Sequence, residues 1–234
     1  KIDGVKLDFN PGTGLPPGWK KTKIKSLISY YIGGGWGKDS VLRDFKNGAY
    51  VIRGTDINNI PHGKIKNVPF RYHKASNLNS RRLQNKDIVF EVSGGSKNEG
   101  VAKSLLVIDS LLKQFKGDVM CASFCKLVRP KTNYLGNFLY QSFKYLRDTK
   151  ASEIFEIRGA SSIVNYNWEG FIKYQELIIP NDDLLLIFDK KIDILINEAH
   201  KLSNQNIILK EAIEILLPRL MSGKIDIEKI DNDI

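Results

Sequence analysis

The sequence contains few of the residues that build common catalytic and metal sites. It has only 2 cysteines and 3 histidines among 234 residues. Cys121 and Cys125 lie four positions apart, which is not the C-x-x-C spacing of a redox pair, and no Cys/His cluster with zinc-ligand spacing accompanies them. The histidines are scattered and suggest no catalytic triad. We therefore expect no metal and no cofactor, and we expect the two cysteines to be buried free thiols.

Long apolar runs are also missing. No stretch approaches the roughly 18 consecutive apolar residues that a membrane helix needs. Nor does a charged start, followed by an apolar segment and a small-residue cleavage site, mark a signal peptide. The expectation is a protein of the reducing cytoplasm with no membrane partner.

A phosphate-binding P-loop is nearly present but out of register. Residues 90–104, FEVSGGSKNEGVAKS, contain two glycines at the right spacing, followed by a lysine and a serine. In a P-loop the lysine directly follows the last glycine, so that it meets the same phosphates as the helix N-terminus. Here Val101 and Ala102 separate Gly100 from Lys103, and the residues that follow favour a strand over a helix. ATP binding is therefore not expected.

A methyltransferase pattern is incomplete as well. Residues 8–14 (DFNPGTG) and 67–70 (NVPF) resemble the glycine loop and the adenine-flipping motif of S-adenosylmethionine methyltransferases. Pro16 and Pro17 disfavour the helix that should follow the glycine loop, and NVPF lacks the first proline of the motif. We expect no methyl transfer by this chain.

Positive charge is in excess and is unevenly distributed. Residues 1–181 carry 29 Lys and Arg against 15 Asp and Glu, a net charge of +14, whereas residues 182–234 carry 7 against 11, a net charge of −4. A basic segment of this kind favours contact with a polyanion, and nucleic acid is the most common one. The alternative is that the lysines only keep the protein soluble.

Apolar patterns predict an α+β, or irregular α/β, body. Strand-like runs occupy residues 48–57, 85–93 and 118–130, and helical spacing occupies residues 134–148. Residues 159–180 are typical of a polar loop, a short helix and a strand. Because strands and helices do not alternate regularly, a doubly wound sheet is not expected.

One long helix should follow the body. From Leu185 onward the seam positions recur at alternating steps of three and four, which are the a and d positions of a coiled-coil heptad. Asn181 or Asp182 is expected to cap its start and Pro218 to end it. The seam comprises Leu185, Phe188, Ile192, Leu195, Ala199, Leu202, Asn206, Leu209, Ile213 and Leu216.

A helix of about 35 residues is about 50 Å long, so it should project and pair with a partner helix. Asn206 is a polar seam position of the kind that fixes register or partner number. The alternative is a helix packed on its own domain. The predicted organisation is a recognition body at 1–181, a coiled-coil helix at 182–217 and a C-terminal tail at 218–234.

Several segments together resemble the specificity subunit of type I restriction-modification enzymes, in order and over almost the whole chain. The most specific are the SGGS loop at 93–96, residues 159–180 (GASSIVNYNWEGFIKYQELIIP) and the ending at 216–227 (LLPRLMSGKIDI). A full subunit of that family has two recognition domains and two long helices. This chain has one of each, so it resembles a half-subunit or the C-terminal half of a full one.

The resemblance implies a non-catalytic protein that reads one half of a bipartite site in double-stranded DNA. Its partners would be methyltransferase (modification) subunits, a restriction subunit, and a second specificity half or a second copy paired antiparallel through the long helix. Two other functions stay open: a fragment of a DNA methyltransferase or nuclease, and a coiled-coil interaction module that does not bind DNA.

The candidate DNA-binding residues lie in predicted loops with basic, amide or hydroxyl side chains. Lysines suit phosphates, Arg suits guanine and Asn suits adenine. They are Lys38 beside a glycine loop, Arg53, Thr55 and Asp56 after a strand, Arg71, Tyr72, Arg81 and Arg82 in a basic segment, Ser96, Lys97 and Asn98 in the SGGS loop, and Arg158.

Overall fold

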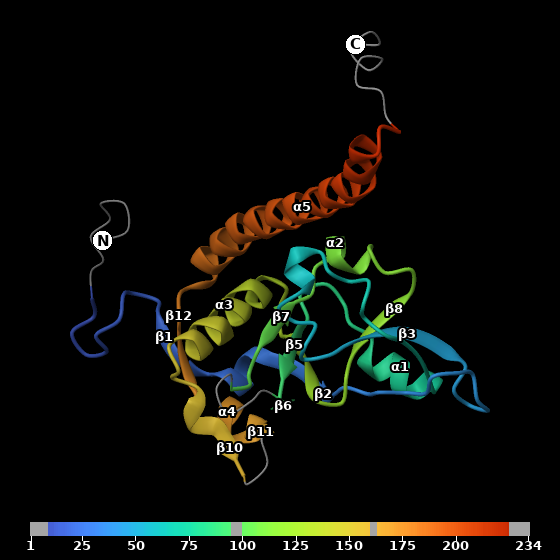
Figure 1. Cartoon of the computed structure of the whole chain (residues 1–234). Helices are drawn as coiled ribbons and strands as arrows, with labels where there is room; N and C mark the ends of the chain where they lie inside the picture. Colours follow the sequence, from blue (N-terminus) through green and yellow to red (C-terminus); the bar gives the residue numbers. More distant parts are fainter. Residues whose placement is uncertain (1–8, 95–99, 160–162, 225–234) are drawn as a thin grey trace.

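The elements of the body are grouped into small sheets, and a long helix follows them (Figure 1). The computed structural model describes residues 9–94, 100–159 and 163–224. Strands and helices are mixed without regular alternation, which confirms the α+β class expected from the sequence.

A four-stranded antiparallel sheet forms the centre of the body. Its strand order is β2 (Ile28–Gly33), β9 (Cys125–Pro130), β5 (Ile88–Glu91) and β7 (Ser104–Leu106). All of β5 is buried, as expected for a strand covered on both faces. Helix α3 (Tyr134–Asp148) packs against this sheet through Leu139 and Phe143, and its bounds match the helical spacing in the sequence.

Three smaller sheets surround this centre. In one, β3 (Asn47–Ile52) pairs antiparallel with β4 (Phe70–His73) and parallel with β8 (Asp118–Cys121). In another, β10 (Glu156–Arg158), β11 (Val164–Tyr166) and β6 (Ser93–Gly94) are antiparallel. The third joins β1 (Lys20–Lys23) to β12 (Glu176–Ile179). The short helices are η1 (Ile24–Leu27), η2 (Ile60–His62), α1 (Ala75–Arg81), α2 (Asp109–Leu112), η3 (Glu153–Phe155) and α4 (Trp168–Tyr174).

Aromatic rings hold the core together. Phe90 in β5 lies 4.9 Å from Trp168 and 5.4 Å from Phe143, measured between ring centroids. Burying such side chains stabilises a fold by roughly 1.5–3 kcal/mol each. The two cysteines are buried and unpaired, as expected, and burial raises the pKa of Cys121 to about 12. Both thiols are therefore poor nucleophiles.

Helix α5 (Asp182–Met221) is the last described element and is longer than predicted. Asn181 caps its start, because the side-chain oxygen accepts a hydrogen bond from the Leu184 N–H at 3.0 Å. The expectation that Pro218 ends the helix is wrong. Proline removes one backbone donor, but it lies in the final exposed turn, where the freed carbonyl can meet water.

The end of α5 is set by Gly223 instead. Gly223 adopts a left-handed φ of 66° and its N–H donates to the Leu220 carbonyl at 3.0 Å. The next N–H, from Lys224, donates to the Arg219 carbonyl at 2.9 Å. These two bonds form a Schellman motif, which satisfies the last carbonyls of a helix. Leu220 and Met221 therefore belong to the helix.

Candidate nucleic-acid interface

Three segments that are far apart in the sequence meet around one pocket of about 680 Å³. Trp36 follows β2, Arg53 and Thr55 follow β3, and Ser93 belongs to β6. Each of these segments was a candidate DNA-binding loop in the sequence. Gly54, Glu91, Gly94, Lys103 and the turn 122–124 complete the lining.

Strand pairing explains why these segments converge. The parallel strands β3 and β8 pair Ile52 with Cys121, so the segments that follow the two strands leave the sheet at the same edge. The glycine loop after β2 is then attached there, since the Gly35 N–H donates to the Cys121 carbonyl at 2.9 Å. A Cβ on Gly34 would lie 2.2 Å from that carbonyl oxygen, so only glycine permits this approach.

Arg53 is held at the rim of the pocket by Asp56. Its Nε donates to Asp56 Oδ2 at 2.9 Å, and Nη2 donates to Oδ1 at 2.8 Å and to the Asn67 carbonyl at 3.0 Å. Asp56 is buried beneath the arginine. Of the predicted trio, Arg53 and Thr55 therefore face the pocket, whereas Asp56 fixes the orientation of the guanidinium.

Arg71 supports Trp36 in a similar way. Its Nε donates to the Trp36 carbonyl at 3.1 Å, and its guanidinium lies 4.5 Å from the centroid of the Trp36 ring. Asp39 completes an ion pair with the same arginine. Lys38 is exposed, and its backbone exchanges two hydrogen bonds of 2.9 Å with that of Tyr72. These contacts hold the exposed Trp36 ring at the pocket, whereas the Lys38 ammonium lies 5.8 Å from the centroid of the Phe45 ring.

Arg81 and Arg82 do not line the pocket. Arg81 Nε donates to the Gly33 carbonyl at 2.9 Å and so supports the glycine loop from α1. Arg82 lies 3.3 Å from Asp118 Oδ1 and is half-exposed. Arg158 is also half-exposed and is paired with Glu156 at 2.6 Å. Ser96, Lys97 and Asn98 lie outside the residues that the structure describes.

Glu91 forms part of the pocket floor and was missed from the sequence. It is only 2% exposed, and its Oε1 lies 3.6 Å from the Nζ of Lys103. Its Oε2 accepts no hydrogen bond from the described residues. Burial raises the pKa of Glu91, and Lys103 acts in the opposite direction. The one signal in the sequence was a carboxylate within the apolar run IVFEV.

Phe124 is the second residue that sequence reasoning missed. It lies in the turn between β8 and β9 and is 63% exposed, although it is fully apolar. Its carbonyl accepts the Val92 N–H at 2.9 Å, which fixes the turn against the strand that leads to Ser93. With Trp36, it gives the pocket two exposed aromatic side chains.

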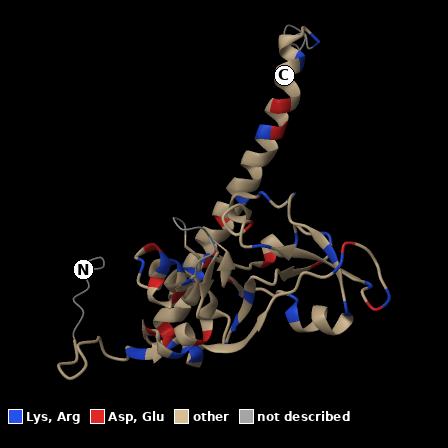
Figure 2. Cartoon of the chain, turned by 60° about the horizontal axis from the view of Figure 1, so that its bottom comes forward, with Lys and Arg blue, Asp and Glu red and all other residues tan. Residues whose placement is uncertain are grey.

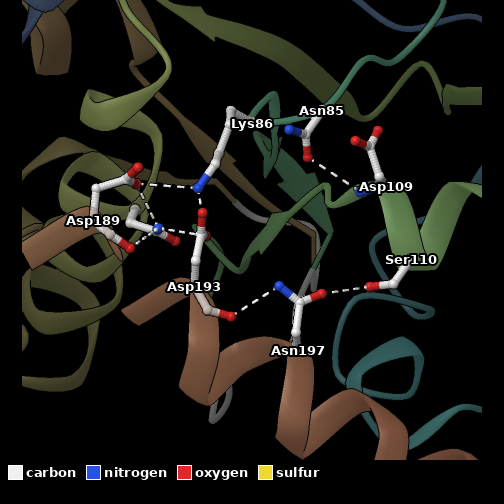
Figure 3. A network of polar contacts seen from close by, with 8 residues as sticks. Asn85, Lys86, Asp109, Ser110, Asp189, Asp193 and Asn197 are labelled. Atoms are coloured by element: carbon white, nitrogen blue, oxygen red, sulfur yellow. Dashed lines mark hydrogen bonds and ion pairs between the residues drawn. The ribbon is translucent and has the colours of Figure 1, made fainter. Parts of the chain in front are cut away.

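A polar joint attaches the body to α5 (Figure 3). Lys86 is buried and forms ion pairs with Asp189, at 3.1 Å, and with Asp193. The Asn137 side-chain amide donates to both carboxylates, at 2.6 and 2.8 Å. Farther along, Ser110 donates to Asn197 at 2.9 Å. Charge and hydrogen bonds therefore join α5 to the body, beside the apolar contacts of Leu185 and Ile196.

Lys86 reaches the helix because its backbone is turned. Its φ is 70°, a left-handed value that is uncommon for a residue with a side chain. Gly136 in α3 makes room for it, since a Cβ there would lie 2.9 Å from the Lys86 Cβ. Sequence reasoning missed Lys86, because nothing in NKD indicates a buried lysine.

One face of α5 contacts the body, and another face carries the predicted seam. Residues that contact the body recur along one face and include Asp189, Asp193, Ile196, Asn197, His200, Asn204, Ile207 and Glu211. The helix therefore packs on its own domain as far as Glu211 and projects beyond it, so it combines the expected projection with the alternative of packing on the body. Figure 2 shows the C-terminal part of α5 standing clear of the body.

The predicted seam forms the other face. Leu185 is 1% exposed at the body end, but Leu195, Leu202 and Leu209 are 64%, 58% and 60% exposed. Ile213 and Leu216 continue this exposed stripe. A stripe of large apolar residues left in water is typical of a surface that meets another protein.

Among the described residues, no group of three or more His, Cys, Asp or Glu side chains is arranged to hold a metal ion. Within the same residues, no helix is both long and apolar enough to cross a membrane.

No protein-family model and no curated protein matches the chain. A solved chain described under "complex assembly and conformational transition of the type I R-M system" is 13% identical, with a TM-score of 0.49, and the match covers 90% of this chain and 46% of that one. A type I restriction-modification S subunit from M. genitalium is 14% identical, with a TM-score of 0.41 and coverages of 94% and 45%.

An HsdS subunit from Thermoanaerobacter tengcongensis is 16% identical, with a TM-score of 0.48 and coverages of 89% and 49%. The chain thus spans about half the length of the solved chains it matches.

Proposed function

We propose that the chain is a DNA-recognition half of a type I restriction-modification specificity subunit. It binds one half of a split site in double-stranded DNA through the face around the Trp36–Arg53–Phe124 pocket. It is not itself an enzyme, and it positions methyltransferase and restriction subunits on the DNA. The observation that carries the proposal is the convergence of three predicted DNA-binding loops on one pocket with basic and aromatic rims.

The contacts of each basic residue suggest its role on DNA. Arg53 already uses Nε and both hydrogens of Nη2 for Asp56 and Asn67, so only Nη1 is left for a ligand. Reading guanine requires two parallel donors, whereas one phosphate oxygen requires a single donor. We therefore assign Arg53 to a phosphate. Lys38 and Lys97 are assigned to phosphates on residue type alone, because lysine carries a compact point charge.

Base reading falls to the other side chains of the pocket. The Thr55 hydroxyl can serve a base edge as donor or acceptor, and Phe124 suits the methyl group of thymine. The Ser93 hydroxyl donates to Asn165 Oδ1 at 2.8 Å, so it serves a base edge as an acceptor. Asp56 and Arg71 act indirectly, by holding Arg53 and Trp36 in place.

The long helix supports a paired arrangement. One body reads only one half of a split site, so a second body is required, and the exposed seam of α5 is the surface that can join them. The second body belongs to another specificity half or to a second copy of this chain. The two basic bodies then bind DNA on either side of a spacer.

Selection from a random duplex library, followed by binding measurements at several salt concentrations, tests the proposal. We expect enrichment of one short sequence. Lys97→Ala should weaken binding to all duplexes and reduce the slope of log K against log salt by about one unit. Lys190→Ala, a charge change on the exposed surface of α5, should leave the slope unchanged. Binding without sequence preference would contradict the proposal.

A coiled-coil interaction module that never touches DNA is the second candidate, and the exposed seam of α5 favours it. It predicts self-association with no duplex binding even at low salt. A fragment of a DNA methyltransferase or nuclease would instead modify or cleave the selected duplex in the presence of S-adenosylmethionine or Mg²⁺.

A further inference from the structure

The loop between β2 and β3 carries an apolar tip. Val41 and Leu42 are adjacent, and they are 57% and 52% exposed although both are fully apolar. The loop extends beyond the sheets, at the right edge of Figure 1. Single exposed apolar residues are common on protein surfaces, but an adjacent pair at a projecting tip is suited to contact with another molecule.

The tip is a tight hairpin. The Leu42 N–H donates to the Phe45 carbonyl at 3.2 Å, and the Phe45 N–H donates to the Leu42 carbonyl at 2.7 Å. Between them Arg43 has a left-handed φ of 43°, a value that a residue with a side chain rarely adopts. Such conformations persist where neighbouring contacts hold them, and they gather at functional segments. The hairpin therefore presents Leu42 from a fixed turn.

Cation–π contacts attach the hairpin to the sheet of β3 and β4. The Nζ atoms of Lys38 and Lys74 lie 5.8 and 5.5 Å from the centroid of the Phe45 ring. Lys38 also exchanges backbone hydrogen bonds with Tyr72 in β4. The base of the loop is therefore fixed, and two ammonium groups lie near the residue that pairs with Leu42.

Both carboxylates of the loop are paired with cations of the body. Asp39 forms an ion pair with Arg71. Asp44 Oδ2 lies 3.7 Å from the Nζ of Lys74. The negative charge of the loop is therefore offset by neighbouring residues.

Two positive side chains of the loop have no such partner. Arg43 and Lys46 are exposed, and neither forms a hydrogen bond or an ion pair with any residue that the structure describes. An apolar tip beside two such cations matches a DNA duplex, in which stacked bases lie between two strands of phosphates. The loop is therefore suited to DNA on grounds of both charge and shape.

Arg71 connects this loop to the pocket. The guanidinium that pairs with Asp39 also lies 4.5 Å from the centroid of the Trp36 ring, at the rim of the pocket. Leu42 follows Trp36 by six positions, so an extended chain separates them by at most about 20 Å. Along one side of a duplex, the major and minor grooves alternate every half turn, or roughly 17 Å. When the pocket lies over the major groove, the tip can therefore reach the adjacent minor groove.

We propose that Leu42 is a wedge that enters the minor groove beside the half-site and partly unstacks one base step. Leucine is among the apolar side chains that wedge between bases from the minor groove and kink the duplex toward the major groove. Arg43 and Lys46 bind the phosphates that flank the opened step. The proposal rests on the DNA binding in the proposed function and adds a deformation of the DNA to it.

The wedge also selects sequence without touching a base edge. Pyrimidine–purine steps such as TA and CA unstack most easily, so a protein that opens a step favours them. We therefore expect the selected duplexes to carry such a step at a fixed distance from the half-site.

Duplexes with 2-aminopurine at successive positions and a dye at each end test the wedge on the full chain. The fluorescence of 2-aminopurine rises when its neighbour unstacks, and energy transfer between the dyes reports the bend. We expect brightening at one step beside the half-site and a bend of at least about 20°. Leu42→Ala should abolish the brightening and most of the bend. Leu42→Met keeps a side chain that can wedge and should retain both.

Leu186→Ala is the matched control, because it removes the same side chain from an exposed position on α5. It should change neither readout. A mismatch at the opened step provides a second measurement, since it lowers the cost of unstacking. The wild-type chain should bind the mismatched duplex about tenfold more tightly than the matched one. Leu42→Ala should bind the two duplexes about equally.

Sequence-specific binding without brightening or bending would overturn the wedge and leave the proposed function intact. Absence of binding to any duplex would overturn both. Vesicles that contain phosphatidylserine test a different surface for the tip. Binding to them that depends on Leu42, with no unstacking of DNA, would assign the tip to an anionic lipid surface and overturn the wedge.

Discussion

The Nζ of Lys86 lies 3.1 Å from Asp189 Oδ1, and this buried ion pair joins the recognition body to the long helix. Lys86→Met should lower the free energy of unfolding by about 3 kcal/mol, because it leaves two carboxylates near the joint without their cation. Urea unfolding measures this. Lys190→Met, next to Asp189 but exposed, should change little; a loss of similar size would show that the joint is not the cause.

The joint should also respond to acid through His200. His200 is buried against Gln114, and burial lowers its pKa below the ordinary 6.5. The folded protein therefore binds this proton less readily than the unfolded chain, so stability present above pH 6.5 is lost as the pH falls. His200→Gln should make the stability curve flatter below pH 6.5. The exposed His62→Gln should leave the curve as it is in the wild type.

The floor of the pocket should not tolerate a side chain at Gly54. A Cβ there would lie 2.2 Å from Glu91 Oε1, so Gly54→Ala must displace the carboxylate or the turn. We expect a loss of about 2 kcal/mol in stability, together with weaker DNA binding. At Gly33 nothing lies within 4 Å of an added Cβ, so Gly33→Ala is the control and should be nearly neutral.

Phe124→Ala should reduce affinity for the selected duplex about fivefold to tenfold, as expected for the loss of one base contact. The slope of log K against log salt should not change, because no charge is removed. Thermal unfolding should be nearly unaffected, since the side chain is largely exposed. An equal loss on unrelated duplexes would remove Phe124 from base reading.

The sequence predicted the elements better than their surroundings. Tyr134–Asp148 was expected as a helix and is α3, because its apolar spacing is unambiguous. The strands around residues 50, 90 and 120 were also expected, since runs of β-branched and apolar residues are a local signal. The end of α5 was wrongly predicted at Pro218, because a proline in an exposed last turn destabilises a helix only slightly. Gly223, with its left-handed φ, ends the helix instead.

Contacts between distant segments could not be predicted in the same way. Arg53 and Asp56 were both placed toward DNA, but the structure pairs them with each other. Lys86 and Glu91 are buried charges, and their roles depend on partners more than 10 positions away along the chain, Asp189 and Lys103. The face of α5 that docks on the body is mostly polar, so an apolar pattern could not reveal it.

The two faces of α5 follow different repeats. Contacts with the body recur about every 11 residues, or three helical turns, as at Asp189, His200 and Glu211. The seam instead repeats every seven residues, or two turns. The body contacts stop at Glu211, and the seam continues beyond them. Whole heptads inserted after Glu211 would therefore lengthen the free arm and leave the docked part of the helix untouched. The length of the free arm and the attachment of the helix to the body can therefore change independently.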